Sequence, residues 1–490
     1  MIKHKITPQA ENFSQWYQDI VLQAQLADYT PVKGCMVILP NGYAIWEKIQ
    51  KELDQRIKAT GVQNAYFPTL IPESFLSKEA EHVKGFAPQC AIVTHVGNQV
   101  LEDKLVVRPT SETLIHYLFS QWIHSYRDLP YLINQWVNVV RWEMKTRPFL
   151  RSNEFLWQEG HTCHVDANEA QYRAQMMLKL YQKFMQEILA IPVFSGIKSE
   201  TEKFAGAIQT YTIEALMQDK KALQLGTSHY FGNRFAKAFK IQYLSQENEL
   251  HWVYQTSWGV STRMIGGVIM AHSDDRGLVL PPRLAFLHVV IVPIFSGNKE
   301  LILKVAQNLK DCIQQEAKGV DFWRDIQIKI DQDESKKTGW KFYQYELLGV
   351  PIRIEIGPKE LELQQVYVVR RDILNQKKIV KWDNLAQKVL EELENMQHAL
   401  FEKAHAFKKA NTMEIHTWEE FKMHSKNGMG VLIAPWCQKK ECEAWINEKT
   451  KFTIRCLPVD EEMQLIKKPG KKCLCGDQGK IIQAIFARNY

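Results

Sequence analysis

The segment from Val140 to His164 reads VRWEMKTRPFLRSNEFLWQEGHTCH, and it limits most strongly what this chain can fold into. Its aromatic and aliphatic residues are typical of buried strands, yet arginine, glutamate and histidine recur throughout it. An unpaired charge is costly to bury, so a sheet core would reject this pattern. The segment therefore predicts strands that form the floor of a cleft, with charges that await a complementary ligand. A solvated sheet face with internal salt bridges is the alternative.

The same segment predicts a hairpin with strands at 140–144 and 152–164, joined by a loop rich in Lys, Arg and Pro. Residues two apart on a strand share a face. The predicted charged face comprises Arg141 and Glu143 on the first strand, and Arg151, Asn153, Phe155, Trp157, Glu159 and His161 on the second. Guanidinium groups suit phosphate oxygens, carboxylates suit amino groups and aromatic faces suit a ring.

A second arginine signal, Arg263, stands in the stretch QTSWGVSTRMIGGVIMAH, before Gly266 and Gly267. Glycines let a backbone or a nucleotide approach closely because they carry no side chain. A glycine-mediated helix packing contact would explain the same letters, so this stretch alone does not decide between the two.

Length and composition limit the class of protein. At 490 residues the chain predicts two or three domains. It contains no run of about 18 apolar residues, and its first residues lack the apolar core of a signal peptide, so cytosolic residence is expected. The net charge of +7 is compatible with a polyanionic partner, but a mildly basic enzyme without one would show the same balance.

Periodicity divides the chain into a first, mixed region and a later α/β region. Amphipathic helices are predicted at 43–60 and 168–190, and the apolar strand in NAYFPTLIP is interrupted by Pro68, which suits a sheet edge or an interface. From His288 onward strands and helices alternate, which predicts a compact α/β domain with a largely parallel sheet at about 285–385. A charged helix at 383–410 is expected to act as a connector.

Five of the nine cysteines crowd the last stretch of chain: Cys437, Cys442, Cys456, Cys473 and Cys475. An odd total in a cytosolic protein argues against a disulfide framework. The clustering favours metal ligation near the C-terminus instead.

Together these features resemble the three-part signature of the class II aminoacyl-tRNA synthetases: a Pro-containing strand after a long helix, an Arg-x-Glu hairpin and a glycine-rich helix with an arginine. In detail the sequence motifs are similar to those of the prolyl-tRNA synthetase family in its archaeal/eukaryotic-type form. The likeness covers essentially the whole chain. It is carried by RPTSE (108–112), the 141–164 segment, TEKFAGA (201–207), LQLGTSHYFGNRFAK (223–237), the stretch around Arg263 and GWKFYQYELLGVPIRIEIGP (339–358).

The resemblance implies an α/β (α+β) protein in three parts. These are a class II catalytic domain built on an antiparallel sheet over 1–284, an α/β anticodon-binding domain over 285–400, and a small zinc-binding-like α/β domain over 401–490. The implied activity is ATP-dependent attachment of L-proline to tRNA(Pro) in two steps through prolyl-adenylate, with release of pyrophosphate and AMP. Mg²⁺ bridging phosphate oxygens is expected from that chemistry. The Pro68 region is expected to form a homodimer interface.

Residue roles follow from the resemblance, position by position. The implied catalytic residues are Arg141 and Arg263. The implied proline-binding residues are Thr110, Glu112, Arg141, Trp157, Glu159, His161, Ser228, His229 and Ser261. The implied ATP-binding residues are Arg141, Glu143, Arg151, Phe155, Gln224, Thr227 and Arg263. Glu112 would receive the secondary amine of proline, and Phe155 would stack on adenine.

Three further expectations depend on the resemblance. TEKFAGA would form a mobile loop that closes over proline, which its Gly206 would permit. The interval between Arg151 and Arg263 is too short for the editing domain of the bacterial-type enzyme, so mischarging would not be corrected in cis. In the anticodon-binding part, tRNA phosphates or guanine edges would meet basic residues that are each, taken alone, typical of a solvated surface: Lys341, Arg353, Lys359, Arg370 and Arg371.

The zinc module of the family has a C-x4-C pair and a later C-x2-C pair. Cys437 and Cys442 match the first pair, but Cys473 and Cys475 form C-x-C, one residue short of the second. A structural Zn²⁺ on these four is expected, with Cys473 as the doubtful ligand and Cys456 as a spare. A metal-free remnant packed by reduced cysteines is the alternative. The terminal Tyr490 resembles the family's last residue, which folds back toward the catalytic domain.

Two other functions stay open from the sequence. A non-charging paralogue could keep the fold as a regulatory or amino-acid-sensing binder, but it would not need the full set of phosphate-binding arginines. An RNA-binding protein that uses only its C-terminal half would leave the predicted catalytic residues unexplained.

Overall fold

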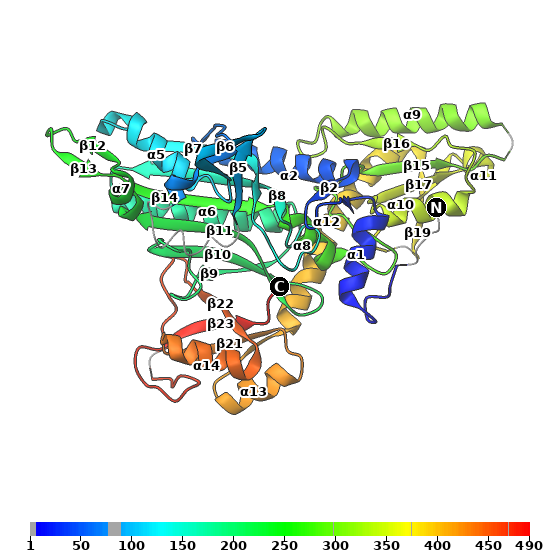
Figure 1. Cartoon of the computed structure of the whole chain (residues 1–490). Coiled ribbons are helices and arrows are strands. Elements are labelled where there is room, and N and C mark those ends of the chain that lie inside the picture. Colours follow the sequence, from blue (N-terminus) through cyan, green and yellow to red (C-terminus); the bar gives the residue numbers. More distant parts are fainter. Residues whose placement is uncertain (1–5, 77–89, 297, 374, 469) are drawn as a thin grey trace.

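The computed structural model describes residues 6–76, 90–296, 298–373, 375–468 and 470–490. Figure 1 shows a large sheet with its covering helices, a second, smaller sheet beside it and the C-terminal region below. Within these described residues, no helix combines the length and the apolar character needed to cross a membrane.

Eleven strands of the described chain form one large sheet, in the order β20-β21-β23-β22-β9-β10-β11-β14-β8-β7-β3. Neighbours pair antiparallel, except β20 with β21 at one edge and β3 with β7 at the other. The antiparallel sheet expected from the sequence is therefore confirmed. The strands are β3 Gln63–Asn64, β7 Tyr131–Val140, β8 Glu154–His164, β9 Val193–Ile197, β10 Gln209–Leu216, β11 Ala222–Gly232, β14 Tyr254–Ser261, β20 Thr412–Glu414, β21 Val431–Trp436, β22 Thr453–Pro458 and β23 Ile482–Ala487.

Helix α6 (Ala167–Glu187) covers one face of this sheet, as the 168–190 periodicity predicts. The hydroxyl of Tyr181 on α6 donates to Oε1 of Gln158 on β8 at 2.6 Å. The apolar side chains of α6, of α2 (Pro40–Lys58) and of this face of the sheet share one hydrophobic core. Because their burial removes a large apolar area from water, this core fixes the sheet and leaves its other face free for polar residues.

The predicted hairpin exists, but its strands lie elsewhere in the sequence. β7 ends at Val140, where the pattern predicts the first strand to begin, and β8 begins only at Glu154. The connection 141–153 leaves the ladder because the Asn153 N–H donates to the Gly34 carbonyl at 2.8 Å and Phe149 has a φ of 58°. A left-handed φ is not strand geometry. The prediction that strand alternation orients Arg141, Glu143, Arg151 and Asn153 is therefore wrong.

The apolar stretch around Pro68 forms two short strands, each at the edge of a sheet. β3 is the last strand of the large sheet, and β4 (Leu70–Pro72) is the edge of a three-stranded sheet with β6 (Gln99–Val107) and β5 (Ala91–Val96). Pro68 lies between them, where its missing N–H breaks no ladder. The predicted position at a sheet edge is confirmed, although the structure has two short strands where the sequence predicts one.

The second sheet has the order β16-β15-β17-β18-β19. β15 is parallel to β16 and β17, whereas β18 and β19 continue the sheet antiparallel, so the largely parallel prediction holds for part of the sheet only. α9 and α12 share a core with Val289 and Ile291 of β15, and Tyr345 of α10 packs with Val290 and Val292 on the other face. The elements are β15 Val289–Pro293, β16 Ile328–Ile330, β17 Ile352–Ile356, β18 Gln365–Arg370, β19 Lys377–Lys381, α9 Lys299–Ala317, α10 Thr338–Leu347 and α12 Leu385–Ala410.

Helix α12 does more than connect two domains. Its first turns, from Leu385 to Leu393, belong to the core of the five-stranded sheet, and Met396 then packs against Ala190 and Val279 of the first region. Near its end, Nζ of Lys408 donates to the Val193 carbonyl at 2.6 Å. The domain boundary expected at 400 thus falls inside a continuous helix, which Figure 1 shows running from the five-stranded sheet to the C-terminal region.

Four of the five basic residues predicted to contact tRNA are buried and already paired with acids. The shortest N–O distances are 3.0 Å for Lys341–Asp331, 2.8 Å for Arg353–Glu346, 2.6 Å for Arg370–Asp372 and 2.7 Å for Arg371–Asp274. Of the five, only Lys359 is exposed. The surface prediction for the other four is wrong because their acidic partners hold them inside the fold; the Arg371–Asp274 pair joins the two large regions.

The remaining elements are short or peripheral. They are α1 Phe13–Gln23, β1 Ala27–Tyr29, β2 Met36–Ile38, α3 Glu73–Leu76, α5 Glu112–Trp122, a 3₁₀ turn Tyr126–Asp128, α7 Arg234–Phe239, β12 Gln242–Leu244, β13 Leu250–Trp252, α8 Arg263–His272, α11 Pro358–Glu362, a 3₁₀ turn Trp382–Asn384, α13 Trp418–Lys426 and α14 Lys440–Thr450. Between Arg151 and Arg263 the chain forms only β8, α6, β9 to β11, α7 and β12 to β14, without a further domain.

Acid should destabilise this fold through buried histidines. His272, whose Nε2 donates to the Leu189 carbonyl at 2.8 Å, has its pKa lowered from 6.5 to about 4 by burial. Because the unfolded chain takes up a proton that the folded chain excludes, this contribution to stability is complete above pH 6.5. It is lost as the pH falls toward 4, and it amounts to about 3 kcal/mol. His272→Gln should therefore flatten the decline of the melting temperature between pH 6.5 and 4, and the exposed control His398→Gln should leave it unchanged. Equal slopes in both variants would contradict this prediction.

Candidate functional site

A cavity of about 240 Å³ opens on the face of the large sheet opposite to α6. Its walls come from β8, β11 and β14, from the loop after β9, from the start of α5, and from the starts of the 141–153 connection and of α8. Twelve of the predicted site residues line it: Thr110, Glu112, Arg141, Phe155, Trp157, Glu159, His161, Gln224, Thr227, His229, Ser261 and Arg263.

The register of the strands brings these residues together. Glu159 on β8 lies opposite Gly259 on β14, which in turn lies opposite Thr227 on β11. Two residues further along β8, His161 lies opposite Ser257 on β14. The alternation predicted for Phe155, Trp157, Glu159 and His161 is confirmed, since all four reach the cavity.

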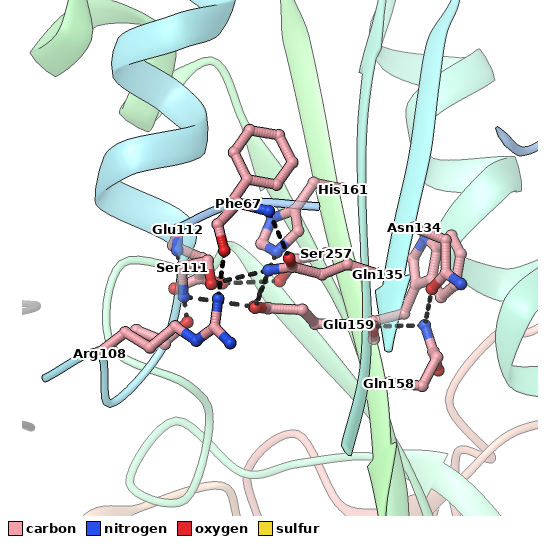
Figure 2. Close-up of polar contacts among 12 residues, drawn as sticks. Phe67, Arg108, Ser111, Glu112, Asn134, Gln135, Gln158, Glu159, His161 and Ser257 are labelled. Carbon is pink, nitrogen blue, oxygen red and sulfur yellow. Dashed lines mark hydrogen bonds and ion pairs between the residues drawn. The ribbon is translucent and has the colours of Figure 1, made fainter. Parts of the chain in front are cut away.

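Glu159 is the centre of a buried hydrogen-bond network (Figure 2). Its carboxylate is 2% exposed and accepts from Nε2 of Gln135 at 2.6 Å and from Nε2 of His161 at 3.0 Å. The backbone N–H of Ser111 lies 3.4 Å away, and Nε2 of Gln135 also donates to the Ser111 hydroxyl at 2.8 Å. These bonds tie β7, β8 and the start of α5 together, and they satisfy a carboxylate that would otherwise be costly to bury.

Glu112 is the first residue of α5 and points into the same cavity. It is 3% exposed, and its Oε1 accepts from the Ser257 hydroxyl at 2.8 Å. Its position in the first turn of a helix favours the charged carboxylate. The Thr110 hydroxyl accepts from the Glu112 N–H at 3.4 Å, so the Thr-Ser-Glu element forms one compact unit.

Arg141 begins the connection after β7, and its side chain lies beside two aromatic rings. The guanidinium is 5.2 Å from the Trp157 ring centroid and 5.6 Å from that of Phe155, and its Nε donates to the Pro109 carbonyl at 2.8 Å. Burial lowers the pKa of Arg141 to about 10, and the nearby Glu159 and Glu112 oppose that shift. The group stays a cation at neutral pH, fixed between aromatic faces and acids.

Arg263 is the first residue of α8, and backbone carbonyls hold its side chain. Nε donates to the Leu150 carbonyl at 3.2 Å and Nη1 to the Gln224 carbonyl at 3.5 Å. Burial and the neighbouring Arg151 lower the pKa of Arg263. Arg151 is exposed and Arg263 is half-buried, and an anion bound between these two repelling cations would be stabilised by both, which points to a ligand with several negative charges.

His229 closes one side of the cavity as a neutral imidazole. Burial lowers its pKa from 6.5 to about 4. Its ring nitrogens lie 3.0 Å from the Thr210 hydroxyl and 3.2 Å from that of Thr227, and its ring centroid lies 4.6 Å from that of Phe204.

Three predicted site residues do not line the cavity. The hydroxyl of Ser228 donates to the Ala174 carbonyl at 2.7 Å, on the α6 side of the sheet, so the prediction that it binds proline is wrong by strand alternation. The Glu143 N–H donates to Asn153 Oδ1 at 2.7 Å in the connection. Arg151 donates through Nη2 to the terminal oxygen of Tyr490 at 2.9 Å, which bears out the expected return of the last residue to the first region.

Other residues that line the cavity were not predicted from the sequence. Ser257 shares the Ser261 side of β14, so strand alternation would have found it. Lys198, Glu202 and Phe204 come from the stretch at and after the end of β9, which contains TEKFAGA. Gln135, which supports Glu159, belongs to an apolar strand and carries no signal in the sequence.

Four cysteine sulfurs converge in the C-terminal region. Sγ of Cys437, Cys442, Cys473 and Cys475 all lie within 4.8 Å of one another. The Cys437–Cys475 and Cys442–Cys473 separations are 3.8 and 3.6 Å. Tetrahedral zinc with Zn–S bonds of about 2.3 Å would place its sulfurs about 3.8 Å apart. Cys473 is therefore a member of this cluster, whereas Cys456 packs on β22 with Leu216 and Ile485, outside it.

Comparison with known families first defines the class. Residues 95–272 match the family model described as tRNA synthetase class II core domain (G, H, P, S and T), residues 288–392 match the anticodon binding domain, and residues 418–490 match the prolyl-tRNA synthetase C-terminal domain. The first match contains all the cavity-lining residues reported above, which makes the site that of a class II synthetase core.

Similarity over the full length then gives the family. The chain is 51% identical over 489 residues to the proline--tRNA ligase of Chlorobaculum tepidum and 50% identical over 489 residues to that of Prosthecochloris aestuarii. Each alignment covers 99% of both chains. The chain therefore belongs to the prolyl-tRNA synthetase family.

Proposed function

We propose that this chain attaches L-proline to tRNA(Pro) with ATP, in two steps through prolyl-adenylate, and that the cavity is where the adenylate forms. One observation carries the assignment of the cavity: Glu159 on the sheet, Glu112 on α5 and Arg141 in the connection after β7 place two carboxylates and a guanidinium in one cavity beside aromatic rings. A non-charging binder would have no use for the second cation of the cavity, Arg263.

Proline is proposed to bind at the end of the cavity near α5. Glu112, with Thr110, receives the secondary ammonium group, because a buried carboxylate selects a cation over a neutral group. The ring lies against the aromatic and polar wall made by Trp157, Glu159, His161, His229 and Ser261. Glu159 acts mainly by holding this wall, since its oxygens already accept hydrogen bonds from Gln135 and His161.

ATP is proposed to bind at the other end. Phe155 stacks on adenine, with Gln224 and Thr227 beside the nucleoside, and Glu143 approaches from the 141–153 connection. Arg141 holds the α-phosphate, and Arg263 and Arg151 hold the outer phosphates. Arg151 must leave Tyr490 to do so, because its Nη2 donates to that residue at 2.9 Å.

Reaction at this site needs positioning and charge neutralisation. The proline carboxylate attacks the α-phosphorus in line and pyrophosphate leaves, so no protein nucleophile takes part. Arg141 and Arg263 oppose the negative charge that develops on the phosphate oxygens. Mg²⁺ carried by the phosphates of ATP supplies further positive charge.

Replacement of Arg141 by alanine tests the roles assigned to the cavity. Arg141→Ala should reduce proline-dependent ATP–pyrophosphate exchange by about 100- to 1,000-fold, because a preorganised cation at the reacting phosphate is lost. The exposed control Arg324→Ala should exchange like the wild type. Normal exchange by Arg141→Ala would contradict the assignment. Arg141→Lys keeps the charge and shows whether a loss reflects chemistry, with circular dichroism as the folding control; unfolding of both variants would make Arg141 a structural residue instead.

The cysteine cluster is proposed to hold one structural Zn²⁺. Sulfur separations of 3.6 and 3.8 Å support this, because they match the edges of a tetrahedral thiolate site. Bound zinc would stabilise the C-terminal region and take no part in catalysis. The division into a catalytic, an anticodon-binding and a C-terminal domain is also proposed. Helix α12 is shared between the second and third of these.

Zinc content tests the cluster directly. The purified chain should carry about one zinc per chain by atomic absorption, and Cys473→Ser should lower this strongly because one thiolate of four is lost. Cys456→Ser is the matched control, since Cys456 is buried elsewhere, and should retain the metal. Full retention by Cys473→Ser would contradict the four-cysteine site.

We also propose that the protein is cytoplasmic, because tRNA(Pro) is its substrate. We propose that it forms a homodimer, because exposed apolar residues lie near Pro68. Tyr66, in the loop between β3 and β4, is 73% exposed, and Ile92, on the β5 edge of the three-stranded sheet, is 46% exposed. Exposed apolar residues of this kind are typical of a contact surface. The anticodon-binding role is proposed for the five-stranded region, where Lys359 is the exposed one of the five basic residues predicted to contact tRNA.

Light scattering tests the dimer. The wild type should have twice the chain mass of 57.1 kDa, and Ile92→Asp should give monomers because a charge would enter the contact. The control Ile379→Asp, a similarly exposed isoleucine on the edge strand β19, should stay dimeric. A monomeric wild type would overturn the proposal.

A further inference from the structure

The loop after β9 forms one wall of the cavity, and the C-terminal region holds it. Lys198, Glu202 and Phe204 of this stretch line the cavity. Inside the cavity, the Phe204 ring centroid lies 4.6 Å from that of His229, and the Phe204 N–H donates to the Thr210 hydroxyl at 3.0 Å. The placement of the loop therefore sets the shape of this wall.

Glu443 on α14 holds the start of this loop. Its carboxylate accepts from the Ser199 hydroxyl at 2.9 Å and from the Thr201 hydroxyl at 2.6 Å, across more than 240 residues of chain. Those two hydroxyl oxygens lie 3.1 Å apart. Glu443 is 8% exposed and Ser199 1% exposed, so the contact between these two is shielded from water, whereas Thr201 lies at the surface. A buried carboxylate that accepts from two hydroxyl donors fixes both of them in place.

A second contact with the same region fixes the base of the loop. β22 pairs with β9 through Leu457 and Ile197, directly before Lys198. Glu214 on β10 accepts from Nζ of Lys198 at 2.7 Å and from Nη2 of Arg455 on β22 at 3.1 Å. All three groups are at most 5% exposed. The base is thus rigid by itself, and Glu443 adds the constraint on the residues that follow it.

We infer that Glu443 is a positioning residue for proline binding: from the C-terminal region, it fixes the loop 199–207 so that Phe204 and Glu202 complete the proline end of the cavity. This inference rests on the proposed assignment of that end to proline. The effect depends on the carboxylate, because alanine would remove the acceptor that both hydroxyls share and leave the buried Ser199 hydroxyl with only that of Thr201 as a partner. Glutamine keeps one carbonyl oxygen and should retain part of the effect.

Kinetics and hydrogen exchange together test this role. Glu443→Ala should raise the KM for proline in ATP–pyrophosphate exchange by about tenfold and change the KM for ATP by less than about twofold. Amide exchange in peptides spanning 199–207 should become faster, while peptides of β8 and β14 stay unchanged. Glu443→Gln should lie between the wild type and Glu443→Ala. The matched control is Glu448→Ala, which removes an exposed glutamate of the same helix and should behave as the wild type.

The partner side makes the test specific. Thr201→Val removes one donor at similar volume, and if Glu443 acts through Thr201 the double variant should be little worse than Glu443→Ala alone. Effects on the KM that multiply fully, an unchanged loop in Glu443→Ala, or an equal effect of Glu448→Ala would each overturn the inference. Zinc content is measured in every variant because Glu443 follows Cys442, and loss of metal from Glu443→Ala would also overturn it. Amide hydrogen exchange can be measured without turnover, so failure of the inference stays distinguishable from failure of the proposed function. Failure of the proposed function would appear as a wild type without proline-dependent ATP–pyrophosphate exchange.

Discussion

The hydrogen bonds that satisfy the buried carboxylate of Glu159 are the interaction on which this structure depends. Gln135 approaches it from β7, His161 from the same strand β8, and the Ser111 N–H from the start of α5. A carboxylate that is 2% exposed needs these donors, because burial without them is strongly unfavourable. Meeting that need fixes where α5 begins relative to the sheet, and with it the position of Glu112. The cleft is therefore built by the same bonds that make its charges tolerable.

Two other charged contacts extend this scaffold beyond the first region. Arg371 pairs with Asp274, which follows α8, so the five-stranded region holds the far end of the helix that begins with Arg263 at the cavity. At the opposite side, Arg455 and Lys198 share Glu214 where β22 joins β9. Each contact joins residues far apart in the chain. The three regions thus share one framework around the cavity, and the large sheet runs from the first region into the last.

Strand alternation predicted the floor of the site because β8 obeys it from Phe155 to His161. It failed for Arg141 and Arg151 because long-range bonds, such as that between Asn153 and Gly34, pull the connection out of the ladder. The same rule, applied to β11, would have rejected Ser228, since Thr227 and His229 already occupy the cavity side. No local pattern reveals that Arg371 has its acid 97 residues away, or that Glu443 meets Thr201. Family resemblance supplied the activity, whereas these pairings depend on the tertiary fold.

The central claim is that the buried charges of the cavity are complements to proline and ATP. A crystal structure of the chain with a non-hydrolysable prolyl-adenylate analogue tests it most directly. We expect the analogue to lie in this cavity, with its ring nitrogen hydrogen-bonded to Glu112, its phosphate mimic to Arg141 and its adenine against Phe155. An analogue bound elsewhere, or one that makes no contact with Glu112 and Arg141, would contradict this assignment of the cavity.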